Sequence, residues 1–457
     1  MSAPPPSAPA LRPAARRWVM LTLLAGVAVA SLDSAIANIA LPTIAGDFHA
    51  SEASSVWVVN AFQLGTALCL LPAAALGEIR GLKPVYAFGM LAFGLASLAC
   101  ALAPSLAWLV LSRFLQGAGA AFLAALVPAI VRRIQPRERI AGGLAWVALT
   151  VAASGAAGPS VAAGILSAAR WPWLFLVNVP ICALALTVFL RQAPPAEPQA
   201  RRFDIAGTLL CALGLGLLVV GVDTLGVDAR AAAAEIAGGL AAAAVLVRQQ
   251  SRRSAPLVPL DLMRIGLFSL SVLTSVCSYA AQILAYVSLP FLFQTVQHRS
   301  AVETGLLVTP WPLLVVFAAP IAGRLTARYP AALLGSLGLA ALAAGLACLA
   351  MMPAAPSALD IAWRMALCGV GFGFFQTPNN TALMTAGPAN RAGAAGGMLA
   401  LARVFGWCLG SALVAVVFGL VPARPTVACL ELACGFAVFG ALASVSRFRA
   451  RPAAGVA

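Results

Sequence analysis

Charged residues are scarce in this sequence. Only 9% of its 457 residues are Asp, Glu, Lys or Arg, against roughly a quarter in an ordinary soluble domain. Apolar residues make up 62% of the chain, and a soluble fold has no interior large enough to bury them all. The composition therefore excludes a cytosolic enzyme, a secreted disulfide module and a disordered chain, and it makes lipid the solvent for most of the protein.

Patterns for disulfides, metals and catalysis are also missing. The 10 cysteines lie in or beside apolar stretches without any C-x-x-C pair, and His49 and His298 are isolated. We interpret the cysteines as small apolar packing residues. A membrane enzyme would need clustered His, Cys or carboxylate side chains near one surface. The sequence therefore predicts no enzyme, no metal site and no cofactor.

The apolar residues form about fourteen segments long enough to cross a bilayer as helices of roughly 20 residues. These segments cover residues 18–41, 55–76, 84–104, 106–131, 140–167, 173–190, 205–224, 231–247, 265–293, 304–325, 331–352, 359–385, 392–421 and 426–446. The weakest is 231–247, which is short and rich in alanine. Basic residues before the first segment resemble the start of a signal peptide. Asp33 and Asn38 interrupt that apolar run, however, which favours an uncleaved first helix.

An even number of spans places both termini on one side of the membrane. If that side is cytoplasmic, most of the 29 Lys and Arg residues fall in cytoplasmic loops and tails, as the positive-inside rule requires. The formal net charge of +15 is then a sign of topology and not of nucleic-acid binding. Lys83 is the only lysine, and this preference for arginine indicates a GC-rich bacterial genome. The sequence predicts a multi-pass protein of the cytoplasmic (inner) membrane with both termini in the cytoplasm.

Short patterns recur about 250 residues apart. Arg113 and Arg364 each lie near the start of a span and precede Gly-x-Gly, and Pro136-x-x-Arg139 recurs as Pro388-x-x-Arg391. Two related six-helix bundles are therefore expected, as in transporters built from repeats. The predicted organisation is a cytoplasmic tail (1–17), an N-terminal bundle (18–191), a linker with two inserted transmembrane helices (192–263), a C-terminal bundle (264–447) and a second cytoplasmic tail (448–457).

Five motifs are similar to those of a known transporter group. Residues 32–42 read L-D-S-A-I-A-N-I-A-L-P, residues 113–120 read R-F-L-Q-G-A-G-A, and residues 154–159 read S-G-A-A-G-P. Residues 171–180 read W-P-W-L-F-L-V-N-V-P, and residues 375–380 read F-Q-T-P-N-N. In this order, the motifs resemble those of the fourteen-helix drug:proton antiporters of the major facilitator superfamily, over essentially the whole chain.

The resemblance implies an all-α membrane protein with the major facilitator fold, in which two inserted central helices join two six-helix bundles. It implies a proton-coupled exporter of amphipathic drugs or toxic organic compounds that works by alternating access, with the proton gradient as its energy source. Expected partners are these small molecules, protons and the lipid bilayer, and the chain is expected to be a monomer that binds no nucleic acid. The alternatives are a dedicated exporter of one endogenous metabolite or antibiotic, and an importer or uniporter.

Asp33 is the candidate site of proton coupling. It lies inside the first span, where an ionised carboxylate is costly and usually functional. The alternative is a structural role, in which Ser34 or the backbone satisfies the carboxylate. Arg113 keeps its charge and needs a carboxylate, carbonyls or water, so it either acts with Asp33 in moving protons or extends toward the outer surface. By the repeat, Gln282 stands near the position equivalent to Asp33, so the second bundle offers no acid there.

Other polar and aromatic side chains inside spans form a candidate substrate path, or they hold helices together. They are Asn38, Asn60, Gln63, Trp146, Gln282, Gln376, Asn379, Asn380 and Arg403, with Asn178 at the start of the sixth span and Trp407 as a further stacking candidate. Arg403 lies in the middle of its span. It either contacts substrate, which would disfavour strictly cationic drugs, or pairs with an acid such as Glu431. Arg364 is expected to pair with Asp360, one turn earlier on the same helix face.

The loop between the second and third spans is a candidate gating element. Glu78, Gly81 and Lys83 match positions of the family's motif in this loop. Glu78 keeps the negative charge of the usual aspartate, but Ile79 replaces the arginine that normally follows it. The resemblance therefore implies weaker charge-based contacts during gating.

The fifth span is a candidate hinge. Gly155, Gly158 and Gly164 should let two helices approach closely. Pro159 removes one backbone hydrogen bond and permits a bend. Ordinary packing of small residues is the alternative interpretation.

Overall fold

The computed structural model describes residues 12–194, 204–225, 228–251, 260–353, 355–387 and 391–448. Every regular element in these ranges is a helix. The elements are α1 Pro13–Asp47, α2 Glu52–Arg80, α3 Leu82–Ala101, α4 Leu106–Ile134, η1 Arg137–Arg139, α5 Ile140–Ala168, α6 Trp173–Leu176, α7 Asn178–Gln192, α8 Ile205–Thr224, α9 Ala229–Gln250, α10 Leu260–Met263, α11 Gly266–Phe291, η2 Leu292–Val296, α12 Ala301–Val308, α13 Pro310–Leu325, α14 Ala331–Ala350, α15 Ala358–Thr385, α16 Ala392–Leu420 and α17 Pro425–Ser446.

In the described ranges, 13 helical segments are long and apolar enough to cross a membrane, and α8 adds a shorter apolar core, Ala206–Val222. The predicted all-helical membrane fold is therefore confirmed. The weakest predicted span, 231–247, is the 22-residue helix α9. Asp228 helps to extend it, because its carboxylate accepts hydrogen bonds from the backbone N–H groups of Arg230 and Ala231. Alanine, the strongest helix former, then continues the helix.

Local signals in the sequence set several helix ends. Ser51 begins α2 by accepting a hydrogen bond from the backbone N–H of Ser54, and Ser300 forms a capping box with Glu303 at the start of α12. Gly81 is the one residue between α2 and α3. Its φ of 93° lies in the left-handed region that glycine adopts without strain, so α3 can begin directly where α2 ends.

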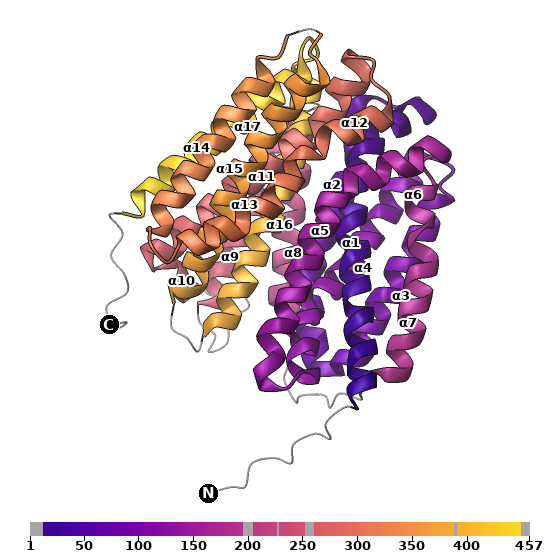
Figure 1. Cartoon of the computed structure of the whole chain (residues 1–457), viewed down its shortest axis with the longest axis vertical. Helices are drawn as coiled ribbons and strands as arrows, with labels where there is room; N and C mark the ends of the chain where they lie inside the picture. The colour runs from indigo at the N-terminus through magenta and orange to yellow at the C-terminus, as the bar shows by residue number, and fades with distance from the viewer. Residues whose placement is uncertain are drawn as a thin grey trace, which may run out of the picture.

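Two bundles of helices lie side by side in Figure 1, with α1–α7 in indigo to magenta and α11–α17 in salmon to yellow. We call them the N-terminal and C-terminal bundles. The end of the molecule at which α1 begins and α17 ends is the terminal side, and the opposite end is the distal side. The distal halves of the two bundles share one hydrophobic core, in which Ile39 of α1 and Ala162 of α5 cluster with Leu284 of α11.

Polar contacts between the bundles also lie in the distal half. Gln294 of η2 donates to the carbonyl oxygen of Ile39 (2.9 Å), and the hydroxyls of Ser160 and Thr309 are 2.8 Å apart. Toward the terminal side the bundles have separate cores, one around Ile130 and the other around Phe268. The two bundles are therefore joined through their distal halves and, between α2 and α16, through the middle of the molecule.

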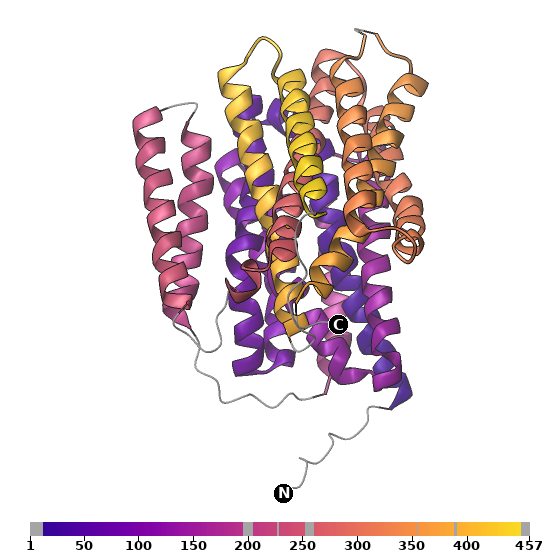
Figure 2. The same cartoon turned by 90° about the vertical axis from the view of Figure 1, so that its left-hand side faces the viewer.

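The inserted helices α8 and α9 pack along each other at one side of the molecule, as the pink pair at the left of Figure 2 shows. Leu215 and Val219 of α8 join a cluster with Leu64 of α2 and Val404 of α16. Gln250 at the end of α9 donates to the carboxylate of Asp204 at the start of α8 (2.8 Å). Helix α8 therefore covers the seam between α2 and α16, and α9 packs against α8.

Arg447 follows the last residue of α17 and is 3% exposed. Its three side-chain nitrogens are buried without a hydrogen-bond partner in the described part of the chain. Burial lowers the pKa of this guanidinium to about 10, because surroundings of low polarity disfavour the charged form. The group is still charged at neutral pH, so an unpaired cation is buried there and opposes folding.

Arg447→Met is expected to raise the midpoint of thermal unfolding in detergent at pH 7. The favourable interaction of a cation with a helix C-terminus is worth about 0.3–1 kcal/mol, whereas burying an unpaired charge costs several kcal/mol. Arg424→Met is the matched control, because the Arg424 side chain is 65% exposed and its loss should leave the midpoint almost unchanged. A lower midpoint for Arg447→Met would show that the guanidinium stabilises the fold.

Candidate functional site

Asp33 lies in the middle of α1 and is 2% exposed. Its carboxylate forms an ion pair with Arg113 of α4. It also accepts hydrogen bonds from the side-chain amides of Gln116 of α4 (2.9 Å) and Asn178 of α7 (2.8 Å). Three helices of the N-terminal bundle are thus held together by one carboxylate. We call Asp33, Arg113, Gln116 and Asn178 the ion-pair network.

Described residues of several helices surround the side chain of Arg113. Its Nε donates to the carbonyl oxygen of Val58 in α2 (3.1 Å), and its guanidinium lies over the rings of Phe62 (4.3 Å) and Phe175 (5.4 Å). It is 1% exposed, so the alternative of an arginine extending to the surface is wrong. Carbonyl, carboxylate and aromatic faces replace the water that the cation would otherwise need.

Gln116 extends the network into α3. Its side-chain oxygen lies 2.5 Å from the Arg113 guanidinium, and its amide nitrogen donates to the hydroxyl of Ser97 (2.8 Å). The sequence contained a signal for Gln116 and Asn178, because each is a polar residue in an apolar motif. Sequence reasoning did not place either one beside Asp33, since both lie in spans other than that of Asp33.

The charge state of the network is coupled to its geometry. With Asp33 ionised and Arg113 charged, the pair has no net charge and each side chain has its hydrogen-bond partners. Protonation of Asp33 would leave the Arg113 cation buried without a counter-charge, and breaking one side of a buried pair costs about 3–5 kcal/mol. The packing of α1 against α4 and α7 therefore depends on both members of this pair.

A second cluster lies in the C-terminal bundle, between α11, α15 and α16. The Trp407 indole donates to the side-chain oxygen of Gln282 (3.3 Å), and Gln376 donates to the hydroxyl of Tyr279 (3.0 Å). The rings of Tyr279 and Trp407 lie edge to face at 5.8 Å, and the Arg403 guanidinium lies 5.5 Å from the Trp407 ring. We call these five residues the aromatic cluster.

The suggested pair between Arg403 and Glu431 is wrong. Glu431 lies 3.4 Å from Arg424 at an exposed position of α17, and Arg403 forms no ion pair with any residue that the structure describes. The predicted pair of Arg364 with Asp360 is confirmed, with a distance of 3.0 Å, and Arg364 also donates to the carbonyl oxygen of Cys348.

The other candidates for the substrate path lie in different surroundings. Asn379 donates to Ser275 (2.7 Å) and so connects α15 to α11. Gln63 is buried, Asn380 is half-buried, and Trp146 of α5 is exposed. The side-chain oxygen of Asn38 and both polar side-chain atoms of Asn60 are buried without a hydrogen-bond partner among the described residues.

Only one of the three glycines proposed for the hinge meets another helix. A methyl group at Gly158 would collide with Ala35 of α1, which places α5 directly against α1. Among the described residues, and apart from the nearby backbone of α5 itself, no atom lies within 4 Å of the position that a methyl group would take at Gly155 or Gly164. The predicted close approach is therefore confirmed at Gly158 and wrong at the other two positions. Pro159 lies inside α5, and its carbonyl oxygen faces Gly305 of α12.

The candidate gating loop lies at the terminal side. Lys83 donates to the carbonyl oxygen of Ala193 (2.7 Å), so it connects the start of α3 to the end of α7 within one bundle. Glu78 is exposed in the last turns of α2, and Gly81 is buried in the turn itself. A gating role for these residues stays a prediction.

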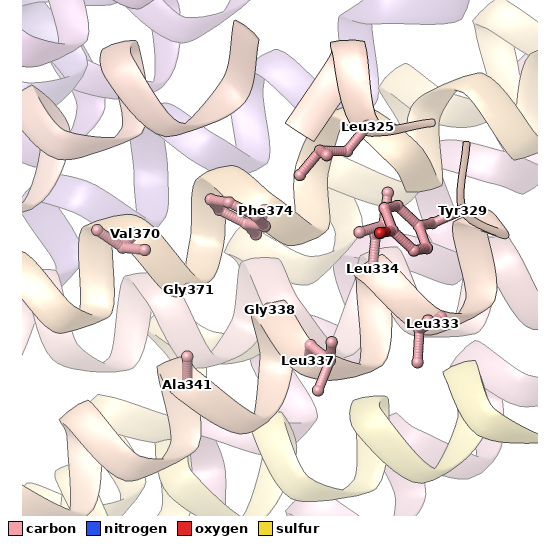
Figure 3. A pocket seen from close by; sticks show the side chains of 10 residues that line it. All are labelled: Leu325, Tyr329, Leu333, Leu334, Leu337, Gly338, Ala341, Val370, Gly371 and Phe374. Atoms are coloured by element: carbon pink, nitrogen blue, oxygen red, sulfur yellow. The ribbon is translucent and has the colours of Figure 1, made fainter. Parts of the chain in front are cut away.

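An open apolar groove of about 350 Å³ lies on the C-terminal bundle, between α13, α14 and α15, and Figure 3 shows the side chains that line it. Leucine side chains and Phe374 line it, and Tyr329 supplies the hydroxyl at its edge. It contains no residue of the ion-pair network or the aromatic cluster. In the described ranges, no group of three or more His, Cys, Asp or Glu residues could hold a metal ion.

Comparisons with known proteins agree with this geometry. The family described as Major Facilitator Superfamily matches residues 23–411. "Uncharacterized transporter YebQ" of Escherichia coli (strain K12) is 47% identical over 405 residues, which cover 88% of this chain and 89% of that protein. "Multidrug resistance protein Stp" of Mycobacterium tuberculosis is 32% identical over 409 residues, which cover 87% of this chain and 75% of that protein.

The solved structures with a similar fold are also transporters. A bacterial homolog of the human lysosomal transporter Spinster, in an inward-facing and unoccupied conformation, aligns with a TM-score of 0.68 at 16% identity. The alignment covers 96% of this chain and 99% of that chain. At this identity the likeness shows the fold alone.

Proposed function

Since the chain belongs to the major facilitator superfamily, we propose that it is a proton-coupled exporter of the fourteen-helix drug:proton antiporter group. Its substrates are amphipathic drugs or toxic organic compounds. The observation that carries the proposal is the buried Asp33–Arg113 ion pair, because it makes the packing of α1, α4 and α7 depend on one proton. The name of the multidrug resistance relative supports the class of substrate.

We place the protein in the cytoplasmic membrane of a bacterium, with its terminal side in the cytoplasm. Five helices that end on that side carry basic residues in their last turns, as the positive-inside rule favours. These residues are Arg80, Arg132, Arg133, Arg191, Arg248 and Arg324. With the bundles joined in their distal halves, this orientation makes the described conformation one that is closed to the outside.

The intact ion pair fits the part of the cycle in which the proton has been released to the cytoplasm. In the proposed exchange, substrate binds from the cytoplasm while Asp33 is ionised, and the bundles rock to open the distal side. A proton from outside then neutralises Asp33 as substrate leaves, and Arg113 keeps the carbonyl of Val58 and the oxygen of Gln116 as partners. The protonated carrier returns to the described conformation and releases the proton.

Two buried side-chain amides support the proposal that the distal side opens and closes during transport. Asn38 precedes Ile39, whose carbonyl accepts a hydrogen bond from the C-terminal bundle, and Asn60 lies one turn from Leu64, which clusters with α16. Buried polar atoms without partners cost about 1–3 kcal/mol each. Opening of the distal side would give water or substrate access to these amides, so their unmet hydrogen bonds favour the second conformation.

Transport in proteoliposomes that contain only the purified full-length chain tests the proposal. With an imposed proton gradient, we expect transport of several chemically different amphipathic compounds, and a protonophore should stop it. Transport that is unaffected by the protonophore would instead indicate a uniporter. Transport of only one compound in a broad panel would indicate a dedicated exporter.

A further inference from the structure

Arg403 differs from the other two arginines inside spans. Arg113 pairs with Asp33, and Arg364 pairs with Asp360. Arg403 has no ion pair in the part of the chain that the structure describes, and its Nε is buried without a hydrogen-bond partner. A guanidinium held in mid-membrane needs an anion, water or polar acceptors. The unmet requirement at Arg403 therefore points to a partner from outside the chain.

The position of Arg403 fits a binding surface between the bundles. Its neighbours in α16, Val404 and Cys408, contact the α2–α8 side of the interface. Arg403, Trp407 and Gln282 are all half-buried. A charged side chain inside a membrane span usually faces the bundle interior or a water-filled cavity and not lipid. Gln282 also occupies nearly the same place in the repeat as Asp33 does in the N-terminal bundle.

The hydrogen bonds inside the aromatic cluster leave donors toward a ligand. The Tyr279 hydroxyl accepts from Gln376, so its own proton is available to donate. The Arg403 guanidinium consists only of donors. Trp407 and Tyr279 provide aromatic edges and faces beside these donors. The cluster therefore combines surface for stacking with positive charge, and it contains no carboxylate that would attract a cation.

We propose, as an extension of the proposed function and resting on it, that the substrates of this exporter are aromatic compounds with an acidic group. The anion binds the guanidinium of Arg403, and the ring packs on Trp407 beside it. The ion-pair network handles the proton in the other bundle. The anionic substrate and the proton thus bind in different bundles, the substrate at Arg403 and the proton at Asp33.

A matched pair of probes tests this assignment without any proton gradient. Binding of 2-naphthoate and of 2-naphthylmethylammonium to the purified full-length chain is measured by calorimetry. The two probes share one ring system and differ in the sign of their charge. We expect the naphthoate to bind the wild type more tightly, and we expect Arg403→Gln to weaken its binding about tenfold to a hundredfold.

Control variants separate binding from folding. Arg403→Lys keeps the charge and should retain part of the affinity for naphthoate. Trp407→Leu should weaken the binding of both probes to the same extent. Arg403→Gln should not lower the thermal midpoint, because it removes a cation that has no ion pair among the described residues. Tighter binding of the ammonium probe to the wild type would overturn the assignment, as would unchanged naphthoate binding in Arg403→Gln or binding of neither probe.

The outcome is independent of the test of proton coupling. Gradient-driven export that is restricted to cations would retain the proposed function and refute the assignment of acidic substrates. If naphthoate binding depends on Arg403 but transport is insensitive to a protonophore, the assignment of acidic substrates is retained and proton coupling is refuted. The two proposals can therefore fail separately.

Discussion

Asp33→Asn is expected to abolish gradient-driven export in proteoliposomes. Asparagine has nearly the same shape as aspartate but cannot exchange a proton at neutral pH, so the cycle loses its coupling step. The variant also leaves the Arg113 cation buried without a counter-charge, which costs about 3–5 kcal/mol of folding free energy. Transport and the midpoint of thermal unfolding should therefore both fall, and they must be measured on the same preparation.

A double variant distinguishes loss of coupling from loss of fold. Asp33→Asn with Arg113→Gln removes both charges and leaves two amides that can hydrogen-bond to each other. Its thermal midpoint should recover most of what Asp33→Asn loses, because no unpaired charge remains. Its gradient-driven transport should stay at the level of empty liposomes. Restored transport in the double variant would show that the pair serves only to stabilise the bundle.

Among Gly→Ala substitutions in the N-terminal bundle, Gly117→Ala is expected to be the most destabilising. A methyl group there would lie inside contact distance of the carbonyl oxygen of Phe62, and one at Gly65 would meet the carbonyl of Phe114. Backbone atoms cannot move aside as a flexible side chain can, so α2 and α4 must separate. We expect a loss of about 3 kcal/mol or more, measured as a lower midpoint of unfolding in detergent.

Gly155→Ala is the matched control for this prediction. It adds the same methyl group to another membrane helix, where no atom lies within 4 Å. Alanine is a better helix former than glycine by about 0.5–1 kcal/mol, so this variant should be equally stable or more stable. Similar midpoints for the two alanine variants would contradict the close contact between α2 and α4. Because Phe62 also covers Arg113, Gly117→Ala should disturb the ion-pair network as well.

Most of the fold followed from hydropathy. In lipid, each backbone polar group must be bonded within the chain, so an apolar run of about 20 residues is a helix almost by necessity. Details that depend on single side chains were harder to predict. Helix α9 is longer than its apolar run because Asp228 caps it. The predicted span 304–325 is two helices, α12 and α13, divided just before Pro310.

The candidate site was only partly predictable. Asp33 and Arg113 each stood out as a charge in an apolar span, but they are 80 residues apart in the chain, and no spacing rule joins them. The pairing of Arg403 with Glu431 was wrong because it rested only on both residues lying in the C-terminal bundle. The sequence did not show that Glu431 is on the exposed side of α17, beside Arg424. Likewise, a run of small residues shows that helices can approach, but it does not show that a partner lies there, as Gly155 demonstrates.

Release of protons on substrate binding tests the central claim most directly. The purified chain is placed in weakly buffered detergent solution with a pH indicator, and a transported compound is added. If substrate binding and protonation of Asp33 exclude each other, wild-type protein that starts protonated will release about one proton per substrate bound, because linkage is reciprocal. The double variant, Asp33→Asn with Arg113→Gln, should bind the compound but release no protons. Equal release from both proteins, or binding to the wild type without release at any pH, would contradict the account.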